Sequence, residues 1–324
     1  MRKIPFIFCI DVEPDERQTD IVIPADWKGF EEAFNFFNRL RPHLEKATGA
    51  PVSFSWFFRM DPQIERTYGQ SVWVVERYGE AIKLLEQSGD ELGLHTHAWR
   101  WSEDLNKWVI DHGNQKWIDH CLQVSFEAYR SAFGRPCLSF RFGDHWMNNE
   151  TMNSLESMGV KFDLTVEPGR RARPTLSAGE LHTGSLPDYT ATPKRPYKPS
   201  QEDFRKLGGS DTRALWVIPI STGKEPGRFA FVKQVARAFG IDLQRRHEEA
   251  PLNLCMTAPG FGVIMDRLID LNRKPYLAPV LRTDSCVHPE FKANVEQNLD
   301  LILSHPMVSS FQFVRPADAI RLLS

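Results

Sequence analysis

The stretch that decides the fold is residues 6–15, Phe6-Ile7-Phe8-Cys9-Ile10-Asp11-Val12-Glu13-Pro14-Asp15. A short apolar run that ends abruptly in carboxylates is typical of a buried central strand whose C-terminal end opens into a site. Asp11 and Glu13 are two residues apart, so both leave an extended strand on the same face. Pro14 lacks a backbone donor and ends the strand. The alternative interpretation is two solvated acids at the start of a surface loop.

The composition is that of a soluble globular protein of 324 residues, 41% hydrophobic and 25% charged, with a net charge of −2. This length allows one large α/β domain or two ordinary ones. The near-neutral charge gives no reason to expect a nucleic-acid partner, and no apolar run approaches the roughly 18 residues of a membrane-spanning helix. The five cysteines form no CxxC pair and are typical of reduced thiols. Because the N-terminus is also a poor signal peptide, we expect a cytoplasmic protein.

Strand-like and helical patterns alternate along most of the chain. After the first strand we expect strands at 51–58, 91–97, 137–142, 160–166, 214–220, 252–257, 277–283 and 309–314. Helices are expected at 29–47, 71–88, 114–133, 148–158, 228–246, 260–273, 289–304 and from 316 onward, with a Trp-rich connection at 98–113. Repeated β-α units form an open doubly wound sheet or a closed barrel, and both place sites at the C-terminal ends of strands. No phosphate-binding glycine motif follows a strand, which argues against nucleotide-binding folds.

The rhythm breaks between about 167 and 213, where Pro, Gly, Arg and Lys are frequent and no period is present. Such a long irregular stretch within a compact domain is usually a functional excursion. A linker between two domains is the alternative, but the α/β pattern resumes afterwards, which favours a single domain over residues 1–324. The basic residues of this stretch are suited to an anionic saccharide or a sugar-nucleotide phosphate. A charged loop is, however, also typical of a solvated surface.

Reactive side chains gather where the expected strands end. They are Asp11 and Glu13, then His95 and His97, then Arg141, Asp144 and His145, and finally Arg282 and Asp284. Two imidazoles and one carboxylate suit a divalent ion with open positions, which polarises a carbonyl and acidifies water. A second carboxylate can serve as the base, held ionised by an arginine. Taken singly, an HxH pair or a strand-end arginine is ordinary, and their coincidence is what indicates a site.

These motifs resemble the polysaccharide deacetylase superfamily (NodB homology, carbohydrate esterase 4), in the branch whose first motif reads Asp-x-Glu. The resemblance rests on Phe8-Cys9-Ile10-Asp11-Val12-Glu13, Glu91-Leu92-Gly93-Leu94-His95-Thr96-His97 and Ser139-Phe140-Arg141-Phe142-Gly143. Residues 155–163 also resemble the helix and strand that follow the arginine motif of the family. The resemblance implies a distorted (β/α)7-type barrel that hydrolyses N-acyl groups from sugars with one divalent metal ion. Zinc is the expected metal, with nickel, cobalt and manganese as alternatives.

The family pattern also implies roles for single residues. Asp11 would be the catalytic base, Arg141 its tether, and Glu13 and His95 metal ligands. The second histidine of the family usually stands four residues after the first, where this chain has Trp99, and His97 is expected to replace it. Glu13 is one methylene longer than the usual aspartate. The late histidine of the family, a general acid, has no clear match; His288 lies near the expected place, and His145 and His182 are other candidates.

We therefore expect a metal-dependent deacetylase that removes an acetyl or formyl group from an amino sugar, an intermediate of surface-glycan assembly. Its saccharide or sugar-nucleotide substrate is expected to contact Trp99, Asp144, His145, Arg282 and Asp284. One alternative is a non-catalytic carbohydrate-binding protein on the same fold. Another is a metal-free glycoside hydrolase that pairs Asp11 with a second acid such as Asp144 or Asp284.

Overall fold

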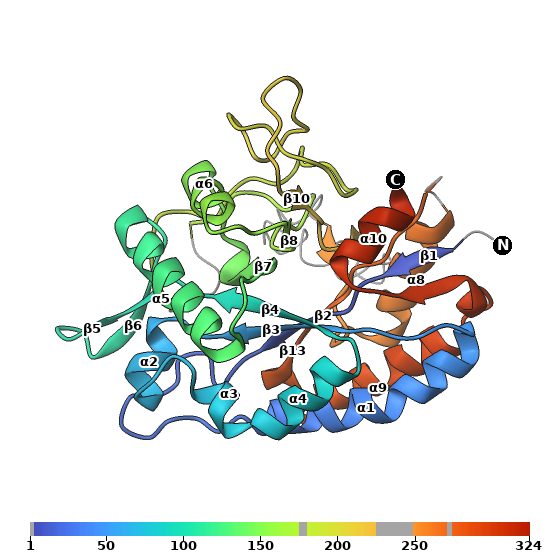
Figure 1. Cartoon of the computed structure of the whole chain (residues 1–324), viewed down its shortest axis with the longest axis horizontal. Coiled ribbons are helices and arrows are strands. Elements are labelled where there is room, and N and C mark those ends of the chain that lie inside the picture. The colour runs from blue at the N-terminus through green and yellow to red at the C-terminus, as the bar shows by residue number, and fades with distance from the viewer. Residues whose placement is uncertain (1–2, 175–179, 225–248, 271–273) are drawn as a thin grey trace, which may run out of the picture.

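A parallel sheet of seven strands forms the centre of the molecule (Figure 1). The computed structural model describes residues 3–174, 180–224, 249–270 and 274–324. The strands pair in the order β10-β8-β7-β4-β3-β2-β13, and every neighbouring pair is parallel. Their bounds are Cys9–Val12 for β2, Ser55–Arg59 for β3, Glu91–Thr96 for β4, Ser139–Phe142 for β7, Phe162–Asp163 for β8, Trp216–Val217 for β10 and Val280–Arg282 for β13.

The sheet curls, and its two edges are joined by irregular backbone. Ser221, after β10, donates its N–H to the carbonyl of Ala278 at 3.1 Å, and its hydroxyl accepts the Ala278 N–H at 2.9 Å. Leu252 bridges the same gap, because it bonds to both Ser221 and Val280. Nearby, β11 (Thr222–Gly223) and β12 (Ala250–Pro251) form a small antiparallel pair. Closure without a regular ladder produces a distorted barrel, which confirms the predicted (β/α)7-type architecture.

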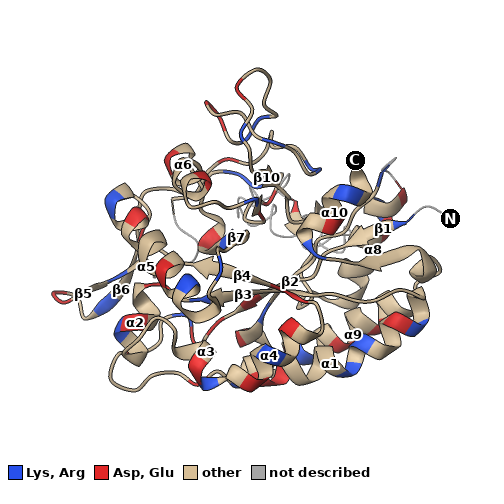
Figure 2. Cartoon of the chain, in the orientation of Figure 1, with Lys and Arg blue, Asp and Glu red and all other residues tan. Residues whose placement is uncertain are grey.

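Helices cover the outside of the sheet. They are α1 (Lys28–Thr48), α2 (Pro62–Tyr68), α3 (Trp73–Arg77), α4 (Gly79–Gln87), α5 (Gln115–Phe133), α6 (Asn149–Ser157), α8 (Ala258–Asp270), α9 (Pro289–Ser304) and α10 (Pro316–Leu323). Phe37 of α1 shows how they attach, since its ring lies 4.9–5.7 Å from those of Phe8, Phe54 and Trp56. Figure 2 shows Lys, Arg, Asp and Glu residues along both α1 and α9. None of the helices within the described ranges is long and apolar enough to cross a membrane.

The alternation of side chains along β2 explains where the site lies. Ile10 belongs to the large core beneath the helices, whereas Cys9 belongs to a smaller cluster that includes Phe57 and is shared by β2, β3, β8, β10 and β13. Asp11 and Glu13 continue the odd-numbered series of Cys9, so their side chains leave on the face of the smaller cluster. Residues from both edges of the curled sheet meet in that cluster. The two acids therefore stand at the inner face of the barrel, at the C-terminal ends of its strands.

Some expected elements differ from those observed. The helix expected at 71–88 is divided into α3 and α4 at Tyr78, where ψ is 28° and no longer helical. Helix α2 forms in a segment expected to be a loop, because Asp61 caps it by accepting the N–H of Gln63. The Trp-rich connection is in fact an antiparallel hairpin, β5 (Trp99–Ser102) and β6 (Lys107–Asp111).

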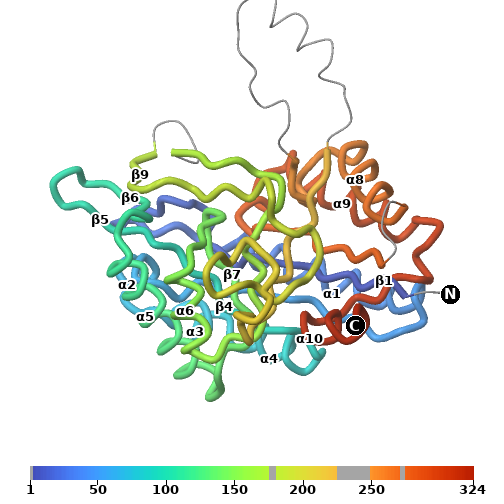
Figure 3. The backbone as a smooth tube through the Cα atoms, turned by 90° about the horizontal axis from the view of Figure 1, so that it is seen from above, coloured from blue at the N-terminus to red at the C-terminus, as the bar shows by residue number. Residues whose placement is uncertain are grey.

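Part of the 167–213 stretch is also ordered as a strand. β9 (Leu181–Thr183) pairs in parallel with β6, and Figure 3 shows it beside the hairpin. β1 (Ile4–Phe6) pairs with β14 (Phe311–Phe313) and extends the start of the chain away from the main sheet. The strand expected at 252–257 is wrong, since β12 covers only 250–251 and a single bridge follows at Asn253. The helix expected at 228–246 lies outside the described residues.

Candidate functional site

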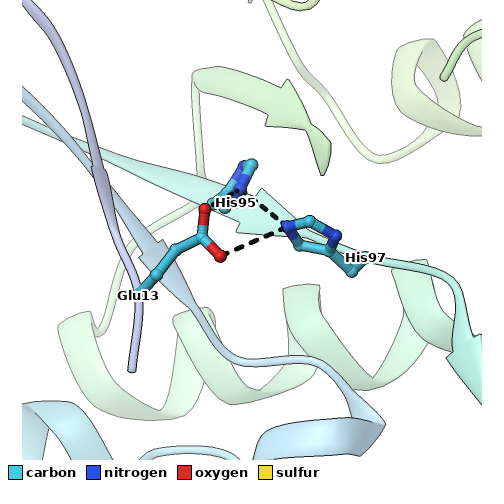
Figure 4. A group of neighbouring side chains, drawn as sticks. All are labelled: Glu13, His95 and His97. Atoms are coloured by element: carbon cyan, nitrogen blue, oxygen red, sulfur yellow. Dashed lines mark hydrogen bonds and ion pairs between the residues drawn. The ribbon is translucent and has the colours of Figure 1, made fainter. Parts of the chain in front are cut away.

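Three buried side chains, Glu13, His95 and His97, converge at the C-terminal edge of the sheet (Figure 4). The two Nε2 atoms are 3.0 Å apart. Glu13 Oε1 is 3.5 Å from Nε2 of His95, and Oε2 is 3.7 Å from Nε2 of His97. Each residue is 2% exposed or less. Across the described ranges this is the only group of three or more acidic, imidazole or thiol side chains whose ligand atoms come this close.

The hydrogen-bond partners of the two histidines fix which nitrogen carries the proton. His95 Nδ1 lies 2.9 Å from the Arg141 carbonyl oxygen, which only accepts, so Nδ1 is the donor. His97 Nδ1 lies 3.0 Å from Asp144 Oδ2. Burial alone would raise the pKa of Asp144, but His97 and Arg17 hold it well below its usual value. Asp144 is therefore a carboxylate that accepts from His97.

In their neutral forms, both imidazoles consequently present Nε2 lone pairs to each other and to the Glu13 carboxylate. Burial lowers the pKa of His97 to about 4, even though Asp144 opposes the shift, so His97 is neutral at pH 7. Two lone pairs at 3.0 Å beside a carboxylate repel one another unless a cation lies between them. Outer hydrogen bonds that hold the Nδ1 proton are also the usual support of metal-bound histidines. These residues therefore fit a divalent metal ion.

Asp144 is itself fixed by two further donors. Trp99 Nε1 donates to Asp144 Oδ2 at 2.7 Å, and Arg17 Nη2 donates to Oδ1 at 2.7 Å. Arg17 also lies over the Trp99 ring, 5.0 Å from its centre. Trp99 and Asp144 were expected to contact substrate, but both are buried and act on His97, so their observed partners support a positioning role.

A strained turn after β7 places Asp144 and His145. Both have a left-handed backbone, with φ of 57° and 56°, which costs a non-glycine residue on the order of 1 kcal/mol or more. Gly143 precedes them and lies against His97, where an added Cβ would be 2.3 Å from the ring. The turn sends Asp144 to His97 and sends His145 the other way, to Glu167, with Nδ1 2.7 Å from Oε1.

The expected base and its tether meet as an ion pair. Arg141 Nε donates to both oxygens of Asp11, at 2.8 and 2.9 Å, and Nη1 donates to the Leu164 carbonyl at 2.6 Å. Because the Arg141 carbonyl also accepts from His95, one residue links the base to the first imidazole. Both side chains of the pair are 5% exposed or less. Asp11 is thus oriented beside the three converging ligands.

Two arginines flank Glu13, and the sequence analysis missed the first of them. Arg59 Nη1 is 3.4 Å from Glu13 Oε2, and Arg282 Nε is 3.2 Å from Oε1. Burial alone would raise the pKa of Glu13, but the Arg282 guanidinium holds it well below the usual value. Arg59 also pairs with Asp61, which accepts the backbone N–H of His97 at 3.0 Å.

Arg59 and Asp61 show the same spacing of two residues as Asp11 with Glu13. The register places Arg59 directly beside His95, and His95 beside Arg141, across β3, β4 and β7. The spacing of two residues between Arg59 and Asp61, directly after an apolar run, was the sequence feature that could have identified Arg59. It was overlooked because the strand was expected to end at Phe58.

The remaining expected site residues lie further from the ligands. Asp284 pairs with Arg282 Nη2. His182 bonds to His112 at 3.1 Å. His288 is exposed at the start of α9, with its ring 5.8 Å from that of Phe291. In the described part of the chain, no hydrogen bond or ion pair joins His288 to the ligand group, and its role as general acid stays a prediction.

Comparisons with known proteins locate this fold. A scan of family models found no match to the chain, and a search of curated proteins found none. Among solved structures, a Parabacteroides distasonis protein described as a glycoside hydrolase/deacetylase aligns with a TM-score of 0.57 and 12% identity, over 99% of this chain and 71% of its own. A Pseudomonas aeruginosa PAO1 protein described as a polysaccharide deacetylase aligns with a TM-score of 0.53 and 13% identity, over 98% of this chain and 90% of its own. The Puue allantoinase aligns with a TM-score of 0.51 and 13% identity, over 98% of this chain and 89% of its own. The chain therefore has the (β/α)7 fold of the NodB-like polysaccharide deacetylases.

Proposed function

We propose that this protein is a metal-dependent hydrolase that removes an acetyl or formyl group from the nitrogen of an amino sugar. The observation that carries the proposal is the convergence of two Nε2 lone pairs and the Glu13 carboxylate beside an arginine-tethered Asp11. A His2Glu set is used by hydrolytic zinc sites that keep an open position. The fold neighbours described as deacetylases support a saccharide substrate, and an intermediate of surface-glycan assembly is the class we favour.

Each residue of the site has a task in this mechanism. Glu13, His95 and His97 would hold the ion, which when bound acidifies water and polarises a carbonyl. Asp11, oriented by its ion pair with Arg141, takes a proton from the attacking water. The water oxygen bonds to the acyl carbon, the carbon–nitrogen bond breaks, and Asp11 returns the proton to the departing nitrogen. The products are a free amino sugar and a carboxylic acid, which becomes the carboxylate when it releases its remaining proton to solvent.

We assign the returned proton to Asp11 because none of the three candidate histidines is suited to store it. His182 bonds instead to His112 at 3.1 Å. His288 is exposed on α9, away from the contacts of the ligand group. Burial lowers the pKa of His145, and Arg170 opposes its protonation, although Glu167 favours it. His145 is therefore neutral at pH 7.

A metal-free glycoside hydrolase fits the geometry less well. Such an enzyme needs a second carboxyl group that can act beside Asp11. Asp144 is fully engaged by His97, Trp99 and Arg17, and its lowered pKa makes it a poor acid. The two imidazoles would also have no task in that reaction.

The experiment compares metal content and amide hydrolysis in three proteins. Wild type, His95→Ala/His97→Ala and a control His43→Ala/His120→Ala, in which both replaced histidines are exposed, are dialysed against zinc, nickel, cobalt or manganese. Metal is counted by plasma mass spectrometry, and amine release is followed from N-acetylglucosamine, its oligomers and their N-formyl analogues. We expect one ion per chain in wild type and control and none in the site variant. A wild type without metal would reject the mechanism and favour the carbohydrate-binding alternative.

A further inference from the structure

We propose that Arg282 contacts the substrate and stabilises the negative charge that develops on the acyl oxygen during hydrolysis. The inference rests on the proposed function and adds a catalytic residue to it. It starts from the position of Arg282 at the end of β13, where its Cα is the register partner of Asp11 on β2. Partners on neighbouring strands of a sheet project to the same face. Arg282 therefore leaves the sheet beside the base.

The guanidinium of Arg282 spans the two acids next to the reaction centre. Its Nε is 3.2 Å from Glu13 Oε1, and its Nη2 pairs with Asp284 Oδ2. These two contacts hold the planar group in one orientation at the edge of the ligand group. A donor that is oriented before the reaction needs no reorganisation when charge appears, which is the condition for effective stabilisation of an oxyanion.

Exposure distinguishes Arg282 from Arg59 and Arg141, the arginines that pair with Glu13 and with Asp11. The side chains of Arg59 and Arg141 are 1% and 5% exposed, whereas that of Arg282 is 29% exposed. Of these three side chains, only that of Arg282 has an exposed part that a molecule entering from solvent can contact.

One donor of Arg282 also lacks a hydrogen bond. Nε is buried and, although close to Glu13, makes no hydrogen bond of acceptable geometry. A buried donor left in this way is unfavourable, so Glu13 does not satisfy Arg282 completely.

The chemistry of amide hydrolysis supplies an acceptor oxygen. When the water oxygen bonds to the acyl carbon, the carbonyl electron pair moves onto the acyl oxygen, which becomes negative. When the carbon–nitrogen bond breaks, that oxygen becomes part of the carboxylate product. A guanidinium is permanently charged and carries five donors in a plane, so it suits both the oxyanion and the carboxylate. Arg282 should therefore bind acetate, the product of deacetylation.

A purely structural role for Arg282 as the counter-ion of Glu13 makes different predictions. In that case its loss changes metal content or folding and leaves acetate binding and turnover of the loaded protein unaltered. The test uses Arg282→Gln and Arg282→Lys. Arg315→Gln is the matched control, because Arg315 is a surface arginine paired with Asp318 at 3.0 Å.

Acetate is titrated into each zinc-dialysed protein by calorimetry, and zinc is counted in the same samples. We expect Arg282→Gln to bind acetate at least 10-fold more weakly, Arg282→Lys to lie between, and Arg315→Gln to match wild type, all with unchanged zinc. With an N-acetylated sugar that the wild type cleaves, kcat of Arg282→Gln should fall about 10²- to 10³-fold with KM nearly constant. Added guanidinium ion should partly restore Arg282→Ala.

Acetate binding or kcat that equals wild type in Arg282→Gln overturns the proposal, and so does loss of zinc from that variant. Failure of the proposed function looks different, since the wild type would then hold no zinc and cleave no amide. In that event the acetate titration of the metal-free proteins still decides the question. Binding that depends on Arg282 supports the contact, and binding that does not depend on it, or is absent, overturns it.

Discussion

Replacing Gly143 with alanine is expected to abolish metal binding while the fold is retained. The added Cβ would lie 2.3 Å from Cε1 of His97 and 2.4 Å from Nδ1 and Nε2. Carbon contacts are comfortable at about 3.5–4.0 Å, so the ring and the turn must separate by more than about 1 Å. Metal sites tolerate about 0.2 Å in ligand distance. Zinc affinity should therefore fall by more than the 10- to 100-fold typical for loss of an outer hydrogen bond.

Overpacking of this kind costs about 1–3 kcal/mol of unfolding free energy, which a domain of this size survives. Calorimetry with zinc gives the affinity, urea unfolding gives the stability, and circular dichroism verifies the fold. Gly79→Ala is the matched control, because Gly79 begins α4 and a Cβ there meets nothing within 4 Å. Its zinc affinity should equal that of wild type. Wild-type zinc affinity in Gly143→Ala would show that this turn does not set the position of His97.

Two further substitutions test the surroundings of the ligands and of Arg141. Asp144→Asn should weaken zinc binding 10- to 100-fold, because a neutral amide holds the Nδ1 proton of His97 less firmly than a carboxylate does. A zinc affinity equal to that of wild type, measured by the same calorimetry, would argue against His97 as a ligand. Burial raises the pKa of Asp163 from 3.8 to about 7, against the hydrogen bonds from Thr165. The folded state thus holds a proton that the unfolded state releases between pH 4 and 7, so stability from this group is present below pH 4 and is lost as the pH rises to 7. Asparagine does not titrate, so the unfolding free energy of Asp163→Asn should rise relative to that of wild type as the pH goes from 4 to 7, by up to about 4 kcal/mol. Above pH 7 the difference should stay constant. A difference in unfolding free energy that does not depend on pH, measured by urea unfolding, would contradict this.

The ligand group could be predicted because its information is local. Asp11 with Glu13, and His95 with His97, each follow an apolar run, and a spacing of two residues keeps a pair on one face of a strand. The parallel arrangement then brings the strand ends to one edge. The spacing of two residues and the shared edge of a parallel sheet are enough to predict that an acid and two imidazoles lie at the same edge, even when the order of the strands is unknown.

The surroundings of that group could not be predicted, because they depend on contacts between distant segments. Arg282 reaches Glu13 from the last strand of the sheet, and Arg17 reaches Asp144 from the loop after β2. Nothing in the local sequence of either arginine specifies its partner. The strained turn at Asp144 is equally hidden, since the Asp144 side chain bonds to His97 and Trp99, which lie more than 40 residues earlier in the chain.

The hairpin β5–β6 offers a structural reason for the proposed ligand His97 at i+2, where the resemblance implies a histidine at i+4. β4 ends at Thr96, and the chain then enters β5 at Trp99, whose backbone pairs with Ile110 and not with the main sheet. A histidine at position 99 would be held by that hairpin. His97 instead remains beside His95, and Trp99 donates to the same Asp144 oxygen that fixes His97. In the proposed site the two positions have different tasks: the imidazole of His97 faces Glu13, and the indole of Trp99 holds the carboxylate of Asp144, which orients His97.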